Sequence, residues 1–175
     1  MEKILYEYSF DFSEFLTLFI PLIVGIGFFY YSVELVKAKK SGEKIGCFPN
    51  GLFLPLGFIV GPLCALLFVV SVFISVQDHI EFTNALKEDA VYTVEGYVEK
   101  FYPMPYEGHD TEHFEIDGVY FEYSDFDMTG GYNKSASHGG VITENGQHLR
   151  IKYVEGQDGA GEESNIILYI AELEK

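Results

Sequence analysis

The chain has 175 residues, of which 48% are apolar and 17% aromatic, and it contains no Trp. This apolar content excludes a disordered chain, and the net charge of −16 argues against a nucleic-acid partner, because phosphate contacts need clustered Lys and Arg. Two cysteines are too few for a disulfide scaffold or for a zinc site built from four cysteines.

The charge is unevenly distributed along the chain. Residues 1–77 carry five basic and six acidic residues, whereas residues 78–175 carry six basic and 21 acidic residues. All five His lie in the second part, and both cysteines, Cys47 and Cys64, lie in the first. We therefore expect the two parts to face different solvents.

Two long uncharged runs follow an acidic N-terminal tail, residues 1–14. The first run spans residues 15–33 and the second spans residues 52–76. Because a helix needs about 20 apolar residues to cross a bilayer, we predict two transmembrane helices that form a hairpin. The alternative is a pair of buried helices in a soluble protein, while a cleaved signal peptide does not fit the late start of the first run.

The loop between the runs, residues 34–51, predicts the orientation of the hairpin. It contains four Lys, namely Lys37, Lys39, Lys40 and Lys44. Lys and Arg are retained on the cytoplasmic side of a membrane. We therefore predict a cytoplasmic loop, with both termini outside the cytoplasm, in a multi-pass protein of the inner or plasma membrane.

Small residues recur every four positions in the second run, at Gly57, Gly61 and Ala65. This spacing lets two helices approach closely. The partner is either the first helix of the same chain, which contains Gly25 and Gly27, or a helix of another protein. Neither run contains Asp, Glu, Lys, Arg or His, which favours an anchor over a transporter.

The acidic part is predicted to start with a juxtamembrane helix, residues 77–89, followed by a β domain, residues 90–175. Alternation over residues 92–99 indicates a strand, and Asp117-Gly118 and Asn145-Gly146 each separate two apolar alternating stretches, which predicts two hairpins. With a last strand at residues 165–173, the pattern is typical of a small antiparallel barrel of the OB or SH3-like kind. The expected fold class is therefore an α+β membrane protein. Its predicted core residues are Val94, Val98, Ile116, Val119, Phe121, Leu149, Ile151, Ile166, Leu168 and Ile170.

Three stretches of the β domain resemble a known group of proteins. TVEGYVE (93–99), FEIDGVYFEY (114–123) and GQHLRIKY (146–153) are similar to segments of small uncharacterised bacterial membrane proteins with a two-helix anchor and a compact extracytoplasmic β domain. The resemblance implies this topology and no known activity. The chain departs from the commonest pattern after residue 153, where VEGQDGAGEES replaces an Asp-Pro and Asn-Pro turn.

The stretch GHDTEH (108–113) contains the candidate metal ligands His109, Asp110, Glu112 and His113. Prolines at positions 103 and 105 predict a loop here, which removes the argument that two His four residues apart share a helix face. Asp125 and Asp127 have the spacing of calcium ligands, but no further ligand follows at the next step. We therefore expect a solvated loop, no metal and no cofactor.

Aromatic residues gather in the two longest predicted loops. They are Phe101, Tyr102, Tyr106, Phe126 and Tyr132. Tyr combines a large contact area with a polar tip, so these rings either form a recognition surface or cover the ends of the barrel and the membrane interface.

The sequence thus predicts a membrane-anchored, non-enzymatic, extracytoplasmic module that engages a protein or an envelope component through residues 101–112 and 124–140. One alternative is a subunit of a larger membrane complex, packed through the second helix. Another is a metal-dependent hydrolase that uses His109 and His113. The expected partners are the lipid bilayer and another membrane or envelope protein.

Overall fold

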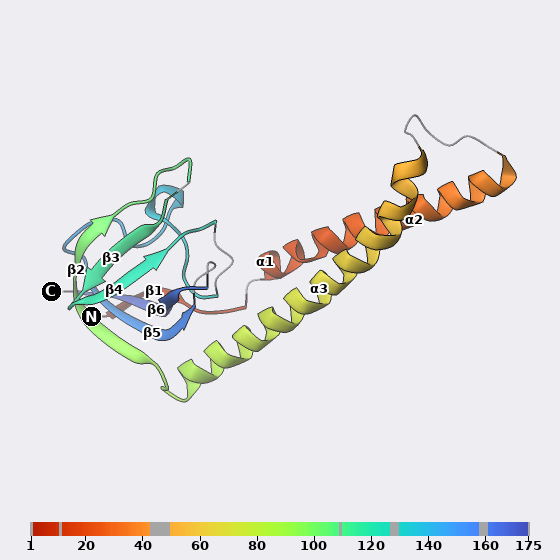
Figure 1. Ribbon diagram of the computed structural model, residues 1–175. Helices are drawn as coiled ribbons and strands as arrows, with labels where there is room; N and C mark the ends of the chain where they lie inside the picture. The colour runs from red at the N-terminus through yellow and green to blue at the C-terminus, as the bar shows by residue number, and fades with distance from the viewer. Residues whose placement is uncertain are drawn as a thin grey trace. The chain divides into compact units, whose positions relative to one another are not determined.

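The computed structural model describes residues 2–10, 12–42, 50–108, 110–126, 130–157 and 161–174. The chain divides into two units (Figure 1). A β unit contains residues 1–10 and 78–175, and a helical unit contains residues 11–77.

The helical unit consists of α1 (Phe12–Thr17), α2 (Phe19–Ser41) and the first part of α3 (Asn50–Lys87). The helices run further than the predicted spans, so Lys37, Lys39 and Lys40 belong to the last turns of α2. Two stretches, Phe15–Ser41 and Leu56–Lys87, are long and apolar enough to cross a membrane. Gly42 ends α2 in the left-handed conformation, at φ 78°, and its N–H donates to the carbonyl of Ala38.

The β unit contains one six-stranded antiparallel sheet. Its strands are β1 (Glu2–Glu7), β2 (Tyr92–Tyr102), β3 (Glu112–Ile116), β4 (Val119–Tyr123), β5 (His148–Gln157) and β6 (Glu163–Leu173), and a 3₁₀ helix, η1, spans Ala136–His138. The strand order is β1-β6-β5-β2-β3-β4, so β1 and β4 are edges and the sheet is not closed. The predicted barrel is therefore not confirmed. Between β6 and β4 the side-chain amide of Asn165 donates a hydrogen bond to the carbonyl of Tyr120, but the two strands do not pair.

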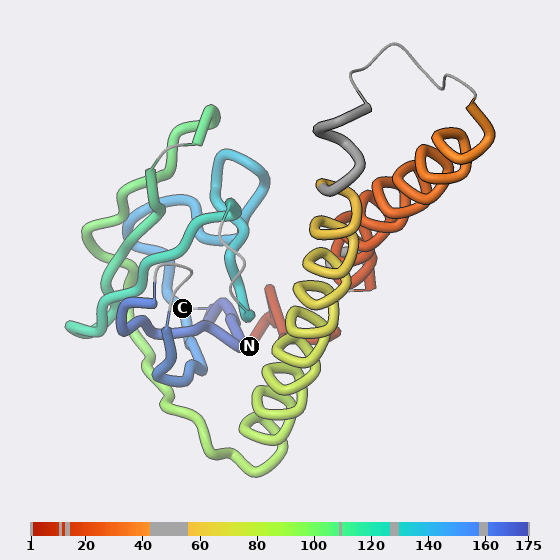
Figure 2. Tube along the Cα trace, turned by 45° about the vertical axis from the view of Figure 1, so that its right-hand side comes forward, coloured from red at the N-terminus to blue at the C-terminus, as the bar shows by residue number. Residues whose placement is uncertain are grey.

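The first strand, β1, was not foreseen in residues predicted to form a tail. It pairs with the end of β6, in a register that runs from Glu2 opposite Leu173 to Glu7 opposite Tyr169. The two ends of the chain therefore lie side by side, as Figure 2 shows for the red first segment and the blue last strand.

One of the two predicted hairpins forms. Asp117 and Gly118 join β3 to β4 with φ values of 48° and 79°, as a two-residue turn of this kind requires. The stretch before Asn145-Gly146 is a compact loop and not a strand, because the side chain of Gln147 forms hydrogen bonds with its backbone. The Gln147 amide accepts from the N–H of Thr143 at 2.7 Å and donates to the carbonyl of Val141 at 3.1 Å.

The core lies on the inner face of this sheet. Of the ten predicted core residues, Val119 and Ile166 are half-buried and the other eight are buried. The start of the chain also contributes, since Leu5 and Tyr6 of β1 pack against the cluster. The last turns of α3 belong to the same unit, and Phe82 is buried there, with its ring centroid 5.3 Å from that of Tyr8.

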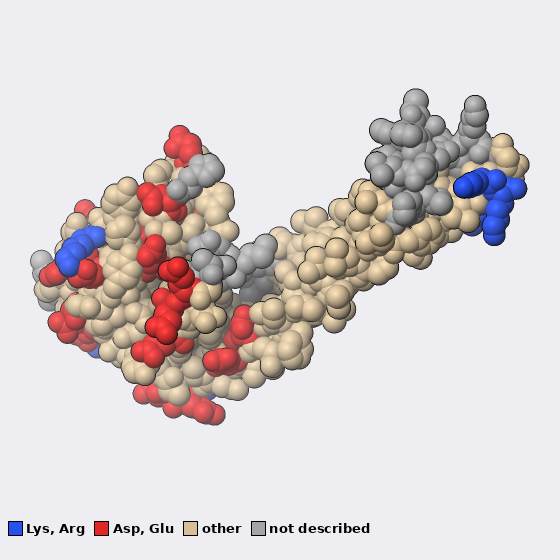
Figure 3. Space-filling view, viewed as in Figure 1, with Lys and Arg blue, Asp and Glu red and all other residues tan. Residues whose placement is uncertain are grey.

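The β unit carries the charge of the molecule. It contains 23 of the 27 acidic residues and seven of the 11 basic residues, which places the entire net charge of −16 in this unit. Figure 3 shows acidic side chains across the strands and basic side chains at the end of α2.

Candidate functional site

A buried carboxylate organises the loops at one end of the β unit. Glu112 begins β3 and lies on the same face of the strand as Phe114 and Ile116, because side chains two apart share a face. Its side chain is fully buried and accepts a hydrogen bond from the Tyr123 hydroxyl at 2.7 Å. It also accepts from the N–H of Ala136 at 2.9 Å and, more weakly, from that of Met104 at 3.4 Å. Glu112 thereby ties both long loops to β3 and β4.

Burial also changes the acidity of Tyr123. Loss of water around its hydroxyl raises the pKa, and the negative charge of Glu112 raises it further. Tyr123 therefore stays a hydrogen-bond donor to Glu112 throughout the physiological pH range.

A second polar cluster follows, formed by Asp125, Ser135 and His138. The Nδ1 atom of His138 lies 2.6 Å from a carboxylate oxygen of Asp125 and 3.1 Å from the hydroxyl oxygen of Ser135, which itself donates to Asp125 at 2.9 Å. A serine nucleophile needs the opposite arrangement, with the serine on one ring nitrogen and the carboxylate on the other. Because both partners meet Nδ1 and Ser135 is fully buried, the cluster fixes the His138 ring and does not activate Ser135.

Two exposed rings lie against His138. Tyr106 and Phe126 have 70% and 66% of their surfaces exposed, and their ring centroids lie 4.7 and 6.4 Å from that of His138. Gly108 allows this meeting, because a Cβ added there would lie 2.6 Å from the Phe126 ring. The loops after β2 and β4 therefore join in one aromatic surface, the loop surface, formed by Tyr106, Phe126 and His138.

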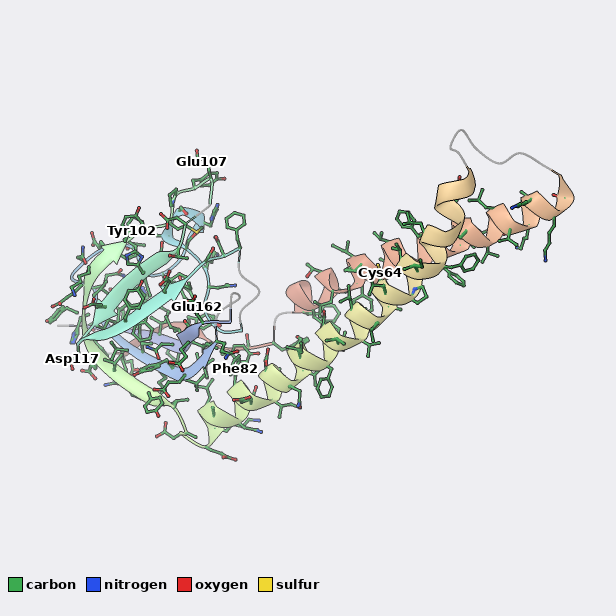
Figure 4. The ribbon with its side chains drawn as sticks, in the orientation of Figure 1. Cys64, Phe82, Tyr102, Glu107, Asp117 and Glu162 are labelled. Carbon is green, nitrogen blue, oxygen red and sulfur yellow. The ribbon has the colours of Figure 1, made fainter. Side chains whose placement is uncertain are left out.

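The other three predicted surface aromatics lie elsewhere. Tyr132 is buried, and its hydroxyl accepts from the N–H of Val141 at 2.6 Å. Phe101 is half-buried and packs against the core. Tyr102, labelled in Figure 4, is exposed on the sheet. Its ring stacks on that of His113, with ring centroids 4.9 Å apart. Tyr132 and Phe101 therefore contribute to the core of the β unit and not to an exposed surface.

The candidate metal ligands that the structure describes do not converge on one point. Glu112 and His113 are neighbours on β3, so one side chain points into the core and the other points outward. Asp110 accepts from the Tyr102 hydroxyl at 3.2 Å, and His109 and Asp127 lie outside the described residues. Within the described part of the chain, no three His, Cys, Asp or Glu side chains gather as metal ligands would.

The glycines predicted to pack in the second membrane span lie in α3, and they face α2 of the same chain. A Cβ on Gly57 would overlap Ser32, and one on Gly61 would lie 2.9 Å from the Cβ of Phe29. On α2, a Cβ on Gly25 would lie 2.6 Å from that of Cys64. Ala65, the third small residue of α3, is half-buried. This small-residue face is therefore used within the hairpin.

Sequence reasoning missed η1 and the inward position of Glu112. The signal for Glu112 was present, because the alternation of residues 114 and 116 extends back to residue 112. The signal for η1 was weak, since its contacts join residues from three separate segments. Compared with family models, with curated proteins and with solved structures, the chain matches none of them.

Proposed function

We propose that the protein is a membrane-anchored, non-enzymatic binding module whose extracytoplasmic β unit engages a protein or envelope component through the loop surface. The observation that carries this proposal is the pair of exposed rings, Tyr106 and Phe126, on a support fixed by buried hydrogen bonds. A binding surface gains affinity when its aromatic groups are held in place before the partner arrives. Buried Glu112 and the Asp125–His138 pair provide this support.

The helical unit supports the anchor. Its apolar side chains point away from the chain itself, and Ile23, Leu66 and Phe73 have 66%, 60% and 65% of their surfaces exposed. A helix of a soluble core would bury these side chains, whereas lipid is a favourable solvent for them. The exposed apolar surface therefore favours two membrane-spanning helices over the soluble alternative.

The sheet supports a hairpin with both ends on one side. Strand β1 precedes the helical unit, β2 follows it, and both belong to the same sheet. Both strands can lie on the same side of the membrane only if the chain crosses it an even number of times, as two helices would do. Lys37, Lys39 and Lys40 at the end of α2, with Lys44 shortly after it in the sequence, favour a cytoplasmic position for this end of the hairpin. The β unit would then lie outside the cytoplasm, at the inner or plasma membrane.

The geometry does not favour the two alternatives. A larger complex packed through the second helix would need the small-residue face that Ser32 and Phe29 already contact. A metal-dependent hydrolase would need ligands that meet, but Glu112 and His113 point to opposite faces of β3.

Site-specific photo-cross-linking in native membranes tests the loop surface. A photoreactive phenylalanine analogue at position 106 or 126 should form an adduct with the same partner, because both rings belong to one surface. Tyr92 is the matched control, since it is also exposed, at 55%, but lies at the start of β2. Absence of adducts at both loop positions, or the same adducts at position 92, would contradict the proposal.

A further inference from the structure

The outer face of β2, β3 and β4 carries a row of aromatic rings, separate from the loop surface. Tyr102, His113 and Tyr120 come from three neighbouring strands, and consecutive ring centroids lie 4.9 and 5.8 Å apart. Tyr102 and Tyr120 have 47% and 45% of their surfaces exposed. These three residues, the ring row, form an aromatic strip that remains open to solvent.

Several carboxylates lie close to the ring row, and some of them repel each other. Glu99 of β2 lies directly opposite Glu115 of β3, and like charges in this position destabilise a sheet. The ammonium of Lys100 contacts both Glu115 oxygens at 2.7 Å, from a left-handed residue at φ 53° in an irregular part of β2. The Tyr120 hydroxyl donates to Glu122 at 2.7 Å. An additional cation on this face would relieve the remaining repulsion.

An acidic groove of about 610 Å³ adjoins the ring row, between β4 and the β5–β6 hairpin. Tyr120 belongs to both features, Glu122 lines the groove beside it, and Glu155, Glu163 and Asn165 line the other side. Within the described residues, Glu122, Glu155 and Glu163 have no Lys or Arg partner. Burial, followed by the hydrogen bond to Glu122, raises the pKa of Tyr120 to about 12. Glu122, Glu155 and Glu163 therefore give the groove negative charge that no described Lys or Arg balances.

Elsewhere on the sheet, several acidic side chains have cationic partners. Arg150 contacts Glu2 at 2.7 Å and Glu95 at 2.9 Å, and Lys152 contacts Asp89 at 3.0 Å. Among the described residues, these ion pairs lie around β5 and β2, whereas Glu122, Glu155 and Glu163 form none with Lys or Arg. The imbalance is local and does not follow from the net charge alone.

We propose that the ring row and the acidic groove together dock an extended, arginine-rich segment of a partner protein. A guanidinium group can stack on a Tyr ring and can bind a carboxylate through two hydrogen bonds, and this face offers both kinds of contact side by side. A second copy of this chain would bring the same negative charge and would be repelled, as would an anionic lipid surface. The docking does not depend on the loop surface, which shares none of these residues.

Binding of fluorescein-labelled oligo-arginine to the full chain in detergent micelles, followed by fluorescence anisotropy, tests this proposal. The double substitution Glu122→Gln with Glu163→Gln should weaken binding about tenfold, because it removes charge-assisted hydrogen bonds. The matched control is Glu88→Gln with Glu144→Gln, which changes the net charge equally at exposed positions outside the groove. The control should change binding less than about twofold, since distant exposed charges are screened by salt.

Further variants separate the rings from the charges. Oligo-arginine should bind more tightly than oligo-lysine of equal length, and Tyr102→Leu with Tyr120→Leu should abolish this preference. If the double Glu variant fails to fold, Glu155→Gln at an exposed position should still weaken binding about threefold. Equal losses in the groove and control pairs, no peptide binding, or stoichiometric binding of calcium chloride without peptide binding would each overturn the proposal. The photo-cross-linking at positions 106 and 126 reads a different surface, so the two proposals can fail independently.

Discussion

Glu112 shows how one side chain can hold two loops in place. Its carboxylate faces the core and its charge is balanced by donors, namely the Tyr123 hydroxyl and the N–H groups of Ala136 and Met104. A buried charge is tolerated when hydrogen bonds replace its water. The loops that carry the exposed rings therefore depend on a residue that no partner touches.

Replacement of Glu112 should destabilise the β unit. Glu112→Ala leaves buried donors without an acceptor, and each such donor costs about 1–3 kcal/mol, so we expect a loss of at least about 3 kcal/mol. Urea unfolding in mild detergent, followed by the near-UV circular dichroism of Tyr, measures the change. Glu99→Gln is the control, because Glu99 is exposed and its loss should cost less than about 0.5 kcal/mol. Equal stability of the two variants would show that the Glu112 network is not structural.

Part of this site could be predicted from the sequence, and part could not. The loop positions of Tyr106 and Phe126 follow from the prolines and glycines around them. The position of Glu112 depends on where β3 begins, because a shift in strand parity turns each side chain to the other face. The contacts of Ser135 and His138 depend on how separate segments meet, which local pattern does not specify.

The helical hairpin is held at its crossing by glycines. A Cβ at Gly61 would enter the space of Phe29, while nothing lies within 4 Å of the Cβ position at Gly27. Close approach of two helix backbones is the main source of packing energy where lipid replaces water. The two glycines therefore form a matched pair for testing helix contact.

Gly61→Leu should separate the helices, and Gly27→Leu should be tolerated. We expect the first variant to lower the temperature at which the detergent-solubilised chain aggregates, because the helices can no longer approach. The second variant should leave that temperature nearly unchanged. Fluorescence-detected gel filtration after heating measures both, and an equal effect of the two substitutions would contradict the observed packing.

The strands show which elements can be predicted from local sequence. The Asp117-Gly118 hairpin was predicted because both turn residues need a positive φ, which this dipeptide supplies. The Asn145-Gly146 dipeptide predicted a second hairpin, but the Gln147 side chain provides the hydrogen bonds that a neighbouring strand would have provided. Strand β1 was missed because its partner, β6, lies at the opposite end of the chain.

For the whole molecule, the sequence correctly separates an apolar helical part from an acidic β part. The predicted barrel was not confirmed, because closing a sheet requires a particular strand tilt and stagger, which a count of strands does not supply. Membrane orientation is the property of the whole molecule on which the proposed function depends.

Labelling of single cysteines in intact cells tests the orientation. With Cys64→Ser, the chain keeps Cys47, which lies between α2 and α3 in the sequence, as its only thiol. With Cys47→Ser and Cys64→Ser, the substitution Glu99→Cys places one thiol at an exposed position of β2. A membrane-impermeant maleimide should label position 99 in intact cells and Cys47 only after permeabilisation. The reverse pattern would place the β unit in the cytoplasm, and equal labelling of both would contradict the hairpin.

The pairing of β1 with β6 has a consequence for biosynthesis. In the described sheet β1 pairs only with β6, and Glu2 lies opposite Leu173, far along the chain. The sheet therefore cannot be completed until β6 has been translated, and both strands must be delivered to the same compartment before they can pair. Contacts between residues so distant in sequence form slowly. During that interval β1 has no partner strand, and a chaperone could protect it from pairing with another chain.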